Sequence, residues 1–290
     1  MRDWRDGVRR VEPYVPGEQP RETKMIKLNT NENPYPPAPG VEKALREINA
    51  GCLRLYPDPE AAVLVKALAE YYGVKPSQVF VGVGSDDVLA MAFLTFFNSD
   101  LPILFPDITY SFYDVWADLF RIPYRQVPLD DQFRIVPEDY LTENGGIVFP
   151  NPNAPTGEEL SQEGIEKILE HNRQSVVIVD EAALSLLEKY DNLLVVQTFS
   201  KSRSMAGMRI GFCIGSEEMI RYLNDVKYSF NSYTMAQTAL ILGVEAVRDR
   251  EYFEKTTARI AETREWAKKE LRRLGFRFGD SKANFIFAAH

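Results

Sequence analysis

The chain has 290 residues, of which 45% are apolar and 26% charged, as is ordinary for a globular protein with one large and one smaller domain. Its formal net charge of −8 argues against nucleic acid or an anionic membrane as the main partner, but leaves room for small anionic substrates held by local arginines. Two cysteines in unrelated segments and two distant histidines make a disulfide framework or a metal site unexpected.

The first 40 residues are rich in proline and predict an extended arm that lies on its own body or on a partner subunit. Residues 1–6 mix charges and do not resemble a signal peptide. No apolar stretch reaches the ~18 residues needed to span a membrane, so we expect a cytoplasmic protein. Helical patterns follow at residues 41–49 and 60–73.

From residue 78 onward, apolar strand-like runs alternate with helical patterns. Strands that alternate with helices predict an α/β fold with a mostly parallel sheet sandwiched by helices. In such a sheet, ligands bind beyond the carboxyl ends of the strands. The strands are predicted at residues 79–83, 101–105, 146–149, 176–179, 193–197 and 210–214.

The C-terminal part predicts a smaller α+β domain. Residues 247–274 form one long charged helical pattern, and residues 276–278 and 284–287 predict a hairpin after it. We therefore expect an arm with part of the small domain at 1–50, a large domain at 51–250, and the start of the C-terminal small domain at 251–290.

Lys201 follows the predicted strand 193–197 and lies among hydroxyl-bearing and small residues. Its amine can form a Schiff base with pyridoxal 5′-phosphate (PLP), while the nearby hydroxyls and Arg209 hold the phosphate of PLP. A solvated lysine in a turn is the plainer interpretation, and it would be favoured for Lys201 alone. The PLP interpretation depends on other segments, which supply the remaining parts of such a site.

Asp180 closes the β-branched run 176–179. A buried carboxylate there can pair with the pyridine nitrogen of PLP and keep it protonated, so that the ring absorbs the electrons of a substrate carbanion. The alternative is an acidic strand end exposed in a loop. One predicted strand lies between Asp180 and Lys201, and this order favours the paired interpretation.

A strand, a glycine turn and a helix start meet at residues 79–87. Backbone amides exposed at such a start attract phosphate. Gly84 would allow close approach of the backbone, and Ser85 and Asp86 would offer N–H groups. An ordinary capped helix explains the same residues equally well, because a glycine turn before a helix is a weak signal.

Asn153 and Tyr110 are candidates on weaker grounds. Asn153 lies in a Pro- and Gly-containing loop at 151–157, from which an asparagine amide can donate to the phenolic oxygen of PLP. Tyr110 follows the strand 101–105, and its ring can stack on the PLP ring. Each of them alone is better explained as part of an ordinary loop or of a buried aromatic segment.

Together these segments resemble the fold-type I aminotransferases, and within them the histidinol-phosphate aminotransferase branch. The motifs occur in the family's order from residue 13 to the end of the chain. Their combination is far more specific than any one of them. They lie at residues 28–35, 56–58, 82–87, 151–157, 179–182 and 200–211.

The resemblance implies a role in cofactor binding for most of the candidates. Lys201 would be the Schiff-base lysine and the proton shuttle, and Asp180 the partner of the pyridinium. Tyr110 would stack on the ring. The phosphate would be held by the side chains of Ser200 and Arg209 and by the backbone at Gly84, Ser85 and Asp86.

Two tyrosines have roles that only the resemblance implies. Tyr56 would reach into the phosphate site of a neighbouring subunit, which would make a homodimer the active unit. Tyr14, on the N-terminal arm, would contact the substrate.

The chain departs from the family pattern in three places. The position before Pro-Thr-Gly, commonly asparagine, is Ala154, and Asn153 is expected to serve instead. The tyrosine usual three residues after the ring-nitrogen acid is replaced by Ala183, and several family residues are missing after Ala182. We expect there either a missing loop or a real deletion that weakens the enzyme. The chain also ends at His290, before the segment in which the family carries an arginine for the substrate carboxylate.

The implied reaction is a transamination, in which the amino group of L-histidinol phosphate passes to 2-oxoglutarate in histidine biosynthesis. An aromatic amino-acid aminotransferase and a threonine-phosphate decarboxylase are close alternatives, because substrate orientation decides which bond breaks. A non-catalytic PLP-binding protein is a more distant one, since Lys201, Asp180 and Arg209 are all present. The expected partners are small molecules and a second copy of the chain.

Overall fold

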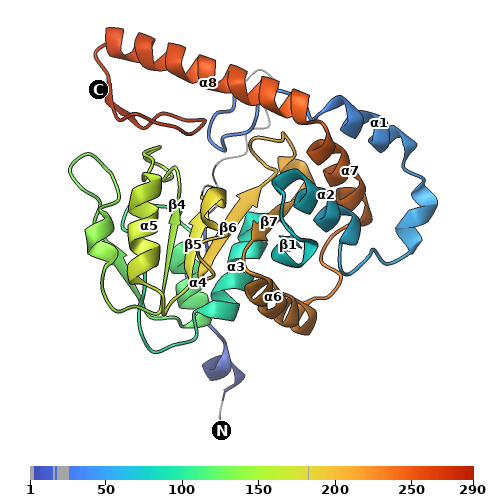
Figure 1. The fold of residues 1–290 in the computed structure, drawn as a ribbon, viewed down its shortest axis with the longest axis horizontal. Coiled ribbons are helices and arrows are strands. Elements are labelled where there is room, and N and C mark those ends of the chain that lie inside the picture. Colours follow the sequence, from blue (N-terminus) through green and yellow to red (C-terminus); the bar gives the residue numbers. More distant parts are fainter. Residues whose placement is uncertain (1–2, 16, 18–25, 182) are drawn as a thin grey trace.

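A seven-stranded sheet forms the centre of the structure (Figure 1). This computed structural model describes residues 3–15, 17, 26–181 and 183–290. The strand order is β1-β7-β6-β5-β4-β2-β3. Only β7 runs opposite to the other six strands, which confirms the predicted mostly parallel α/β sheet. The strands are β1 (Val79–Gly82), β2 (Ile103–Pro106), β3 (Tyr124–Val127), β4 (Gly146–Pro150), β5 (Val177–Asp180), β6 (Leu193–Thr198) and β7 (Gly211–Ile214).

Helices cover both faces of this sheet. None of the helices in the described part of the chain is both long and apolar enough to cross a membrane. The helices are α1 (Pro39–Glu47), α2 (Ala62–Tyr72), α3 (Ser85–Phe96), α4 (Tyr113–Phe120), α5 (Gln162–His171), α6 (Glu217–Phe230), α7 (Gln237–Arg248) and α8 (Arg250–Arg273).

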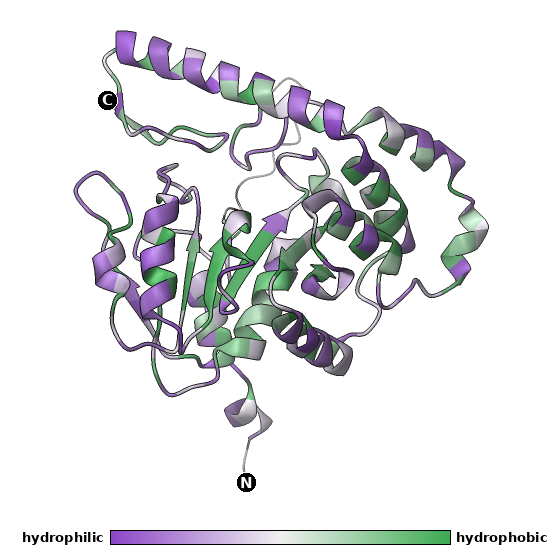
Figure 2. Cartoon of the chain, viewed as in Figure 1, coloured by the Kyte–Doolittle hydropathy of each residue, from purple (hydrophilic) through white to green (hydrophobic). Residues whose placement is uncertain are grey.

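Alternate side chains along each strand point to opposite faces, and each face has its own core. On one face, Ile178 and Leu194 pack with residues of α3, α4 and α6. On the other face, Val177 and Val195 pack with α5. At the β1 and β7 end of that second face, α1, α2 and α7 complete the cover. The strands are accordingly the most apolar part of the chain (Figure 2), and each fully buried aliphatic side chain contributes about 1.5–3 kcal/mol.

The C-terminal helical pattern is interrupted at Asp249, so the single helix predicted at 247–274 is wrong in this detail. Helix α7 ends at Arg248 and α8 begins at Arg250. The Asp249 carboxylate accepts a hydrogen bond from the backbone N–H of Tyr252 at 3.1 Å and caps the new helix. Helix α8 then runs along the top of the molecule in Figure 1 as a mostly hydrophilic helix.

After α8 the chain turns back beneath the helix and ends in a short hairpin (Figure 1). Strands β8 (Arg277–Phe278) and β9 (Ala288–Ala289) pair antiparallel. A hairpin was predicted here, with its second strand slightly earlier, at 284–287. At the other terminus, the described part of the arm contains one short 3₁₀ turn, Trp4–Gly7, before α1 begins. The expected discontinuity after Ala182 lies outside the described residues.

The strand directions gather the candidate residues at one edge of the sheet. The parallel strands β2, β4, β5 and β6 end at this edge, and β1, which runs in the same direction as they do, ends there too. Because β7 runs antiparallel, it begins at this edge, and Arg209, two residues before its start, lies there as well. The site expected at the carboxyl ends of the strands thus also includes Arg209, which precedes a strand instead of following one.

Candidate active site

A cavity of about 680 Å³ opens at this edge of the sheet. Its floor comes from the ends of β4, β5 and β6, from the start of α3 and from the segment before β7. Its other walls come from residues 30–32 of the arm, from α8 and from residues 282–285. Seven predicted site residues line it, namely Ser85, Asp86, Tyr110, Asp180, Ser200, Lys201 and Arg209.

The start of α3 is shaped for close backbone approach. Gly84 precedes the helix with φ +87°, a backbone conformation that residues with a side chain rarely adopt. A Cβ on Gly211 would lie 2.3 Å from the backbone nitrogen of Ser85, so only a glycine lets β7 pass here. The first N–H groups of a helix have no partner within the helix, and the N-terminal dipole favours an anion. Ser85 and Asp86 therefore begin an anion-binding turn.

The Asp86 carboxylate is shared by two cavity residues. One oxygen accepts a hydrogen bond from the Tyr110 hydroxyl at 2.6 Å, and the other pairs with Arg209 Nη2 at 3.0 Å. Burial and the neighbouring Asp86 raise the pKa of Tyr110, so its hydroxyl stays a proton donor. This arrangement fixes the guanidinium beside the start of α3. The sequence interpretation assigned Asp86 only a backbone role, and its side chain is the unexpected part.

Asp180 ends β5, and its Oδ1 is buried without a hydrogen-bond partner among the described residues. Burial, followed by repulsion from Glu181 and Asp86, raises the pKa of the Asp180 carboxyl well above its usual range. A buried carboxyl oxygen without a partner is costly. The site therefore suits a bound group that offers an N–H donor to Asp180.

Lys201 follows β6 and is held by the N-terminal arm. Its Nζ donates to the backbone carbonyl of Thr30 at 2.7 Å, and the Asn33 side chain donates to the Lys201 carbonyl at 2.9 Å. Burial lowers the pKa of the Lys201 amine, while the neighbouring carboxylates of Glu181 and Glu32 oppose this shift. The arm contacts were missed from the sequence, although the motif at 28–35 was the available signal.

Glu181 is a second acid at the cavity, and the sequence interpretation gave it no role. Its side chain opens onto the main cavity and onto a neighbouring one of about 210 Å³. Desolvation by the surrounding protein raises the pKa of its carboxyl, and the positive charge of Lys201 opposes this shift.

Asn153 does not line the cavity; its neighbour Ala154 does. The Asn153 amide donates to the Ile108 carbonyl at 2.9 Å and to the Thr156 hydroxyl at 3.2 Å. Its oxygen accepts from the Thr109 hydroxyl at 3.0 Å. With both amide hydrogens engaged in holding the loop, Asn153 is not arranged to replace the asparagine expected at position 154.

Tyr14 and Tyr56 also lie outside the cavity lining. The Tyr14 ring packs on Phe112 with ring centroids 4.3 Å apart, next to Tyr110. The Tyr56 side chain is 83% exposed and touches the ring of Tyr233. Tyr14 is thus adjacent to the cavity, whereas Tyr56 points to the outside of this chain.

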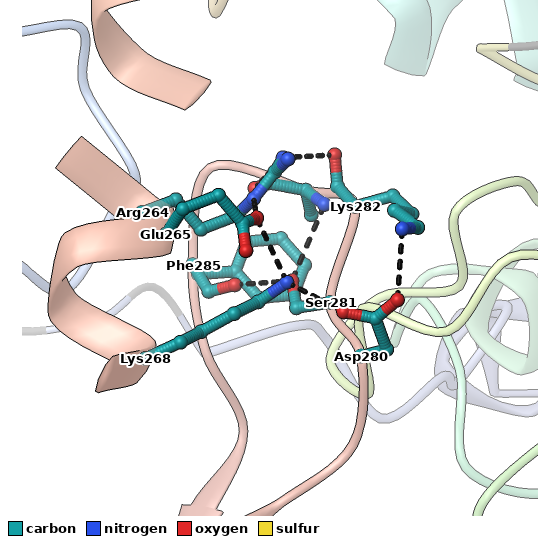
Figure 3. Close-up of polar contacts among 8 residues, drawn as sticks. Arg264, Glu265, Lys268, Asp280, Ser281, Lys282 and Phe285 are labelled. Atoms are coloured by element: carbon teal, nitrogen blue, oxygen red, sulfur yellow. Dashed lines mark hydrogen bonds and ion pairs between the residues drawn. The ribbon is translucent and has the colours of Figure 1, made fainter. Parts of the chain in front are cut away.

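Helix α8 and the segment after it close the cavity, and the sequence interpretation gave them no site role. The α8 residues Thr257, Ile260, Ala261 and Arg264 line the cavity, and their spacing places them on one helical face. That spacing was the signal that could have identified them. Figure 3 shows Arg264 and Lys268 of α8 bound to the segment 280–285.

Comparison with known proteins gives consistent matches. The family described as "Aminotransferase class I and II" matches residues 23–290. The histidinol-phosphate aminotransferase of Lactococcus lactis subsp. cremoris (strain MG1363) is 52% identical over 99% of this chain and 83% of that protein. The protein of the same name from Chromohalobacter salexigens is 53% identical over 99% of this chain and 84% of its own length.

Solved structures share the fold. The histidinol-phosphate aminotransferase from Sinorhizobium meliloti, solved in complex with pyridoxal-5′-phosphate, has a TM-score of 0.81 at 23% identity. The match covers 89% of this chain and 74% of that one. At this identity the likeness concerns the fold alone.

Proposed function

This chain belongs to the class I and II aminotransferases, and from that premise we propose that it transfers the amino group of L-histidinol phosphate to 2-oxoglutarate with PLP as its cofactor. Relatives that share about half of its residues over nearly its whole length bear the name of that reaction. The observation that carries the proposal is the convergence of Lys201, Asp180 and Arg209 on one cavity.

The residues around the cavity fit PLP. The buried Asp180 Oδ1, without a partner among the described residues, suits the protonated nitrogen of a pyridine ring. Arg209 and the first N–H groups of α3 suit a phosphate. The Lys201 amine suits an aldehyde. When bound, PLP supplies that aldehyde and a ring that absorbs the electrons released as the substrate Cα loses its proton.

In this proposal Lys201 moves the proton. Since burial lowers the pKa of its amine, more of it is neutral at a given pH than of an exposed lysine. The neutral Nζ can accept the proton of the substrate Cα and later return one. The Thr30 carbonyl, which accepts a hydrogen bond from Nζ, orients this amine from the arm.

Asp180, Arg209 and Ser200 would hold the cofactor in place. The Asp180 carboxyl would keep a proton on the ring nitrogen, because a cation beside it favours its charged form. Arg209 and Ser200 would bind the cofactor phosphate, with the Ser200 hydroxyl already accepting a hydrogen bond from Thr198 at 3.0 Å. The Tyr110 ring would lie against the cofactor ring.

We also propose a cytoplasmic homodimer as the active unit. Around Tyr56, the side chains of Leu53 and Leu55 are 64% and 58% exposed, and the adjoining Tyr233 is 47% exposed. Contiguous exposed apolar surface of this kind is typical of an interface. Because Tyr56 points away from this chain's own cavity, it is free to reach another one. Sedimentation of the wild type and of Tyr56→Asp tests this proposal. The wild type should sediment as a dimer, and a monomeric wild type would contradict the proposal.

Substrate profiling tests the function. The protein loaded with PLP is assayed for glutamate formed from 2-oxoglutarate with L-histidinol phosphate or phenylalanine as the donor, and for carbon dioxide released from threonine phosphate. The expected result is the highest kcat/KM with L-histidinol phosphate. Turnover led by phenylalanine or by decarboxylation would replace the proposal with that activity, and binding of PLP without any turnover would indicate a non-catalytic protein.

A further inference from the structure

A second cavity, of about 210 Å³, adjoins the candidate active site. Glu181, Thr198 and Ser202 line both cavities. The rest of the second cavity is lined by aromatic rings, by Gln197 and by the cation of Arg203. The rings belong to Tyr71, Tyr72, Phe212 and Phe253. The proposed function uses neither these rings nor Arg203.

Arg203 is a buried cation without a charged partner. The residue is 6% exposed, and none of the carboxylates in the described part of the chain forms an ion pair with it. Asp249 borders a small gap beside Arg203, but its carboxylate caps α8 instead. Taking a charge out of water is costly unless an opposite charge or hydrogen bonds compensate for it. The second cavity therefore suits a ligand that brings a negative charge to Arg203.

One edge of the Arg203 guanidinium is left for such a ligand. Nη1 donates to the Ala246 carbonyl at 2.7 Å, whereas Nε and Nη2 make no hydrogen bond with the described residues. The ring centroids of Phe253, Tyr71 and Phe199 lie 4.4, 4.8 and 5.4 Å from the guanidinium carbon. These rings offset part of the cost of burial and hold the guanidinium in place. The two N–H groups of the edge formed by Nε and Nη2 match the two oxygens of a carboxylate.

A tight turn after Lys201 places neighbouring residues on different cavities. The backbone N–H of Ser204 donates to the Lys201 carbonyl at 3.2 Å, and that of Met205 donates to the Phe199 carbonyl at 3.0 Å. Ser204 adopts a φ of +61°, which is uncommon for a residue with a side chain. The turn brings Lys201 to the main cavity and Arg203 to the second one. A ligand bound at Arg203 would therefore lie beside the PLP site and not in it.

The other polar groups decide which anion fits the second cavity. The Tyr72 hydroxyl donates to Gln197 Oε1 at 2.6 Å, and Gln197 Nε2 donates to the Glu181 carbonyl at 2.8 Å. The Ser202 hydroxyl makes no hydrogen bond with the described residues, so it remains for the ligand. Glu181 is the one acid among the described residues that line this cavity. Its carboxylate, whose charge Lys201 partly offsets, disfavours a ligand with a second negative charge.

We propose that the second cavity binds a small monocarboxylate. The carboxylate would pair with the Nε and Nη2 edge of Arg203, and the apolar chain of the ligand would lie against the aromatic rings. A water molecule occupies about 30 Å³, so the cavity has room for about six or seven non-hydrogen atoms, and butyrate is of this size. The site is separate from the one proposed for the cofactor and the amino donor, so both can be filled at once.

The test titrates the PLP-loaded protein with butyrate and with butyramide, a neutral analogue of the same shape, by ligand-observed NMR. We expect butyrate to bind with a dissociation constant on the order of 1 mM, and butyramide to bind at least about tenfold more weakly. Arg203→Met keeps a chain between the rings and should raise the dissociation constant of butyrate by about tenfold or more. The matched control is Arg248→Met near the end of α7, whose side chain is 69% exposed, and it should leave the affinity unchanged.

Two further variants refine the test. Arg203→Lys keeps the charge without the paired N–H groups, so its affinity for butyrate should lie between those of the wild type and Arg203→Met. Glu181→Gln removes the competing negative charge and should bind butyrate at least as tightly as the wild type. Urea unfolding midpoints near that of the wild type would show that a loss of binding is not a loss of structure.

The contrary results are equally specific. A wild type that does not bind butyrate, or binds butyramide as tightly, overturns the assignment. Equal binding of butyrate by the wild type and Arg203→Met also overturns it, because butyrate then occupies another place such as the main cavity. If inorganic phosphate binds at Arg203 more tightly than butyrate does, the monocarboxylate is the wrong ligand class.

Discussion

The guanidinium of Arg209 rests directly against Gly84, so that a Cβ on this glycine would lie 2.5 Å from Arg209 Nη2. The contact joins the segment before β7 to the start of α3. It exists because β1 and β7 pair antiparallel, with Gly82 opposite Gly211. The proposed phosphate site thus depends both on the charge of Arg209 and on the lack of a side chain at Gly84.

Gly84→Ala should weaken the binding of PLP by about tenfold or more, because the added methyl displaces Arg209 and strains the turn. Gly73→Ala is the matched control. Gly73 has a similarly positive φ of +70°, but a Cβ there would meet nothing within 4 Å. Both variants should lose about 1 kcal/mol of stability. Fluorescence titration with PLP checks the affinity, and equal affinities in the two variants would contradict the assignment.

Lys201→Ala should lower kcat by about a thousandfold or more, because the amine that moves the proton is removed. It should also end covalent retention of the cofactor. Mass spectrometry after borohydride reduction checks this, with the exposed Lys255→Ala on α8 as the control. Retention of PLP on the Lys201→Ala chain would place the reactive amine elsewhere.

Asp180→Asn should change how the stability of the cofactor-free protein depends on pH. The pKa of Asp180 is raised from an ordinary value of 3.8, so the folded chain binds its proton more tightly than the unfolded chain. The resulting stability is present below the ordinary pKa and is lost as the pH rises through the raised value. Asparagine does not titrate.

Urea unfolding of both proteins at intervals from about pH 4 to 8 measures this difference. The wild type should lose stability relative to Asp180→Asn as the pH increases. Saturating PLP should oppose the loss in the wild type, since the ring nitrogen gives the carboxylate a partner. Parallel pH profiles without cofactor would mean that Asp180 does not titrate abnormally.

Asp280→Ala should destabilise the protein by about 1–3 kcal/mol, because the buried Lys268 loses one of its two carboxylate partners. It should also raise KM, since Asp280 helps to hold the part of the active-site cavity that Arg264 and Lys282 line. Asp100→Ala, in an exposed loop, is the control. Urea unfolding and steady-state kinetics check the two effects, and a neutral result would mean that Glu265 alone suffices for Lys268.

The predicted strands correspond to six of the seven in the sheet because their apolar residues alternate between two buried faces. Strand β3 was missed because Tyr124, Arg125 and Gln126 are exposed at the sheet edge. The break at Asp249 was missed because apolar and charged residues continue in a helical pattern on both sides of it. A single capping carboxylate decides that boundary.

By itself, the sequence determined the α/β sheet, the family of the protein and the segments that carry Lys201, Asp180 and Arg209. These features follow from the order of the motifs and from the spacing of apolar residues along the chain. Only the tertiary structure decided that Asn153 faces its own loop, that Thr30 meets Lys201, and that Arg264 and Lys282 line the same cavity. Those relations join residues far apart in the chain. They depend on which way each side chain points after folding, and local pattern does not record that direction.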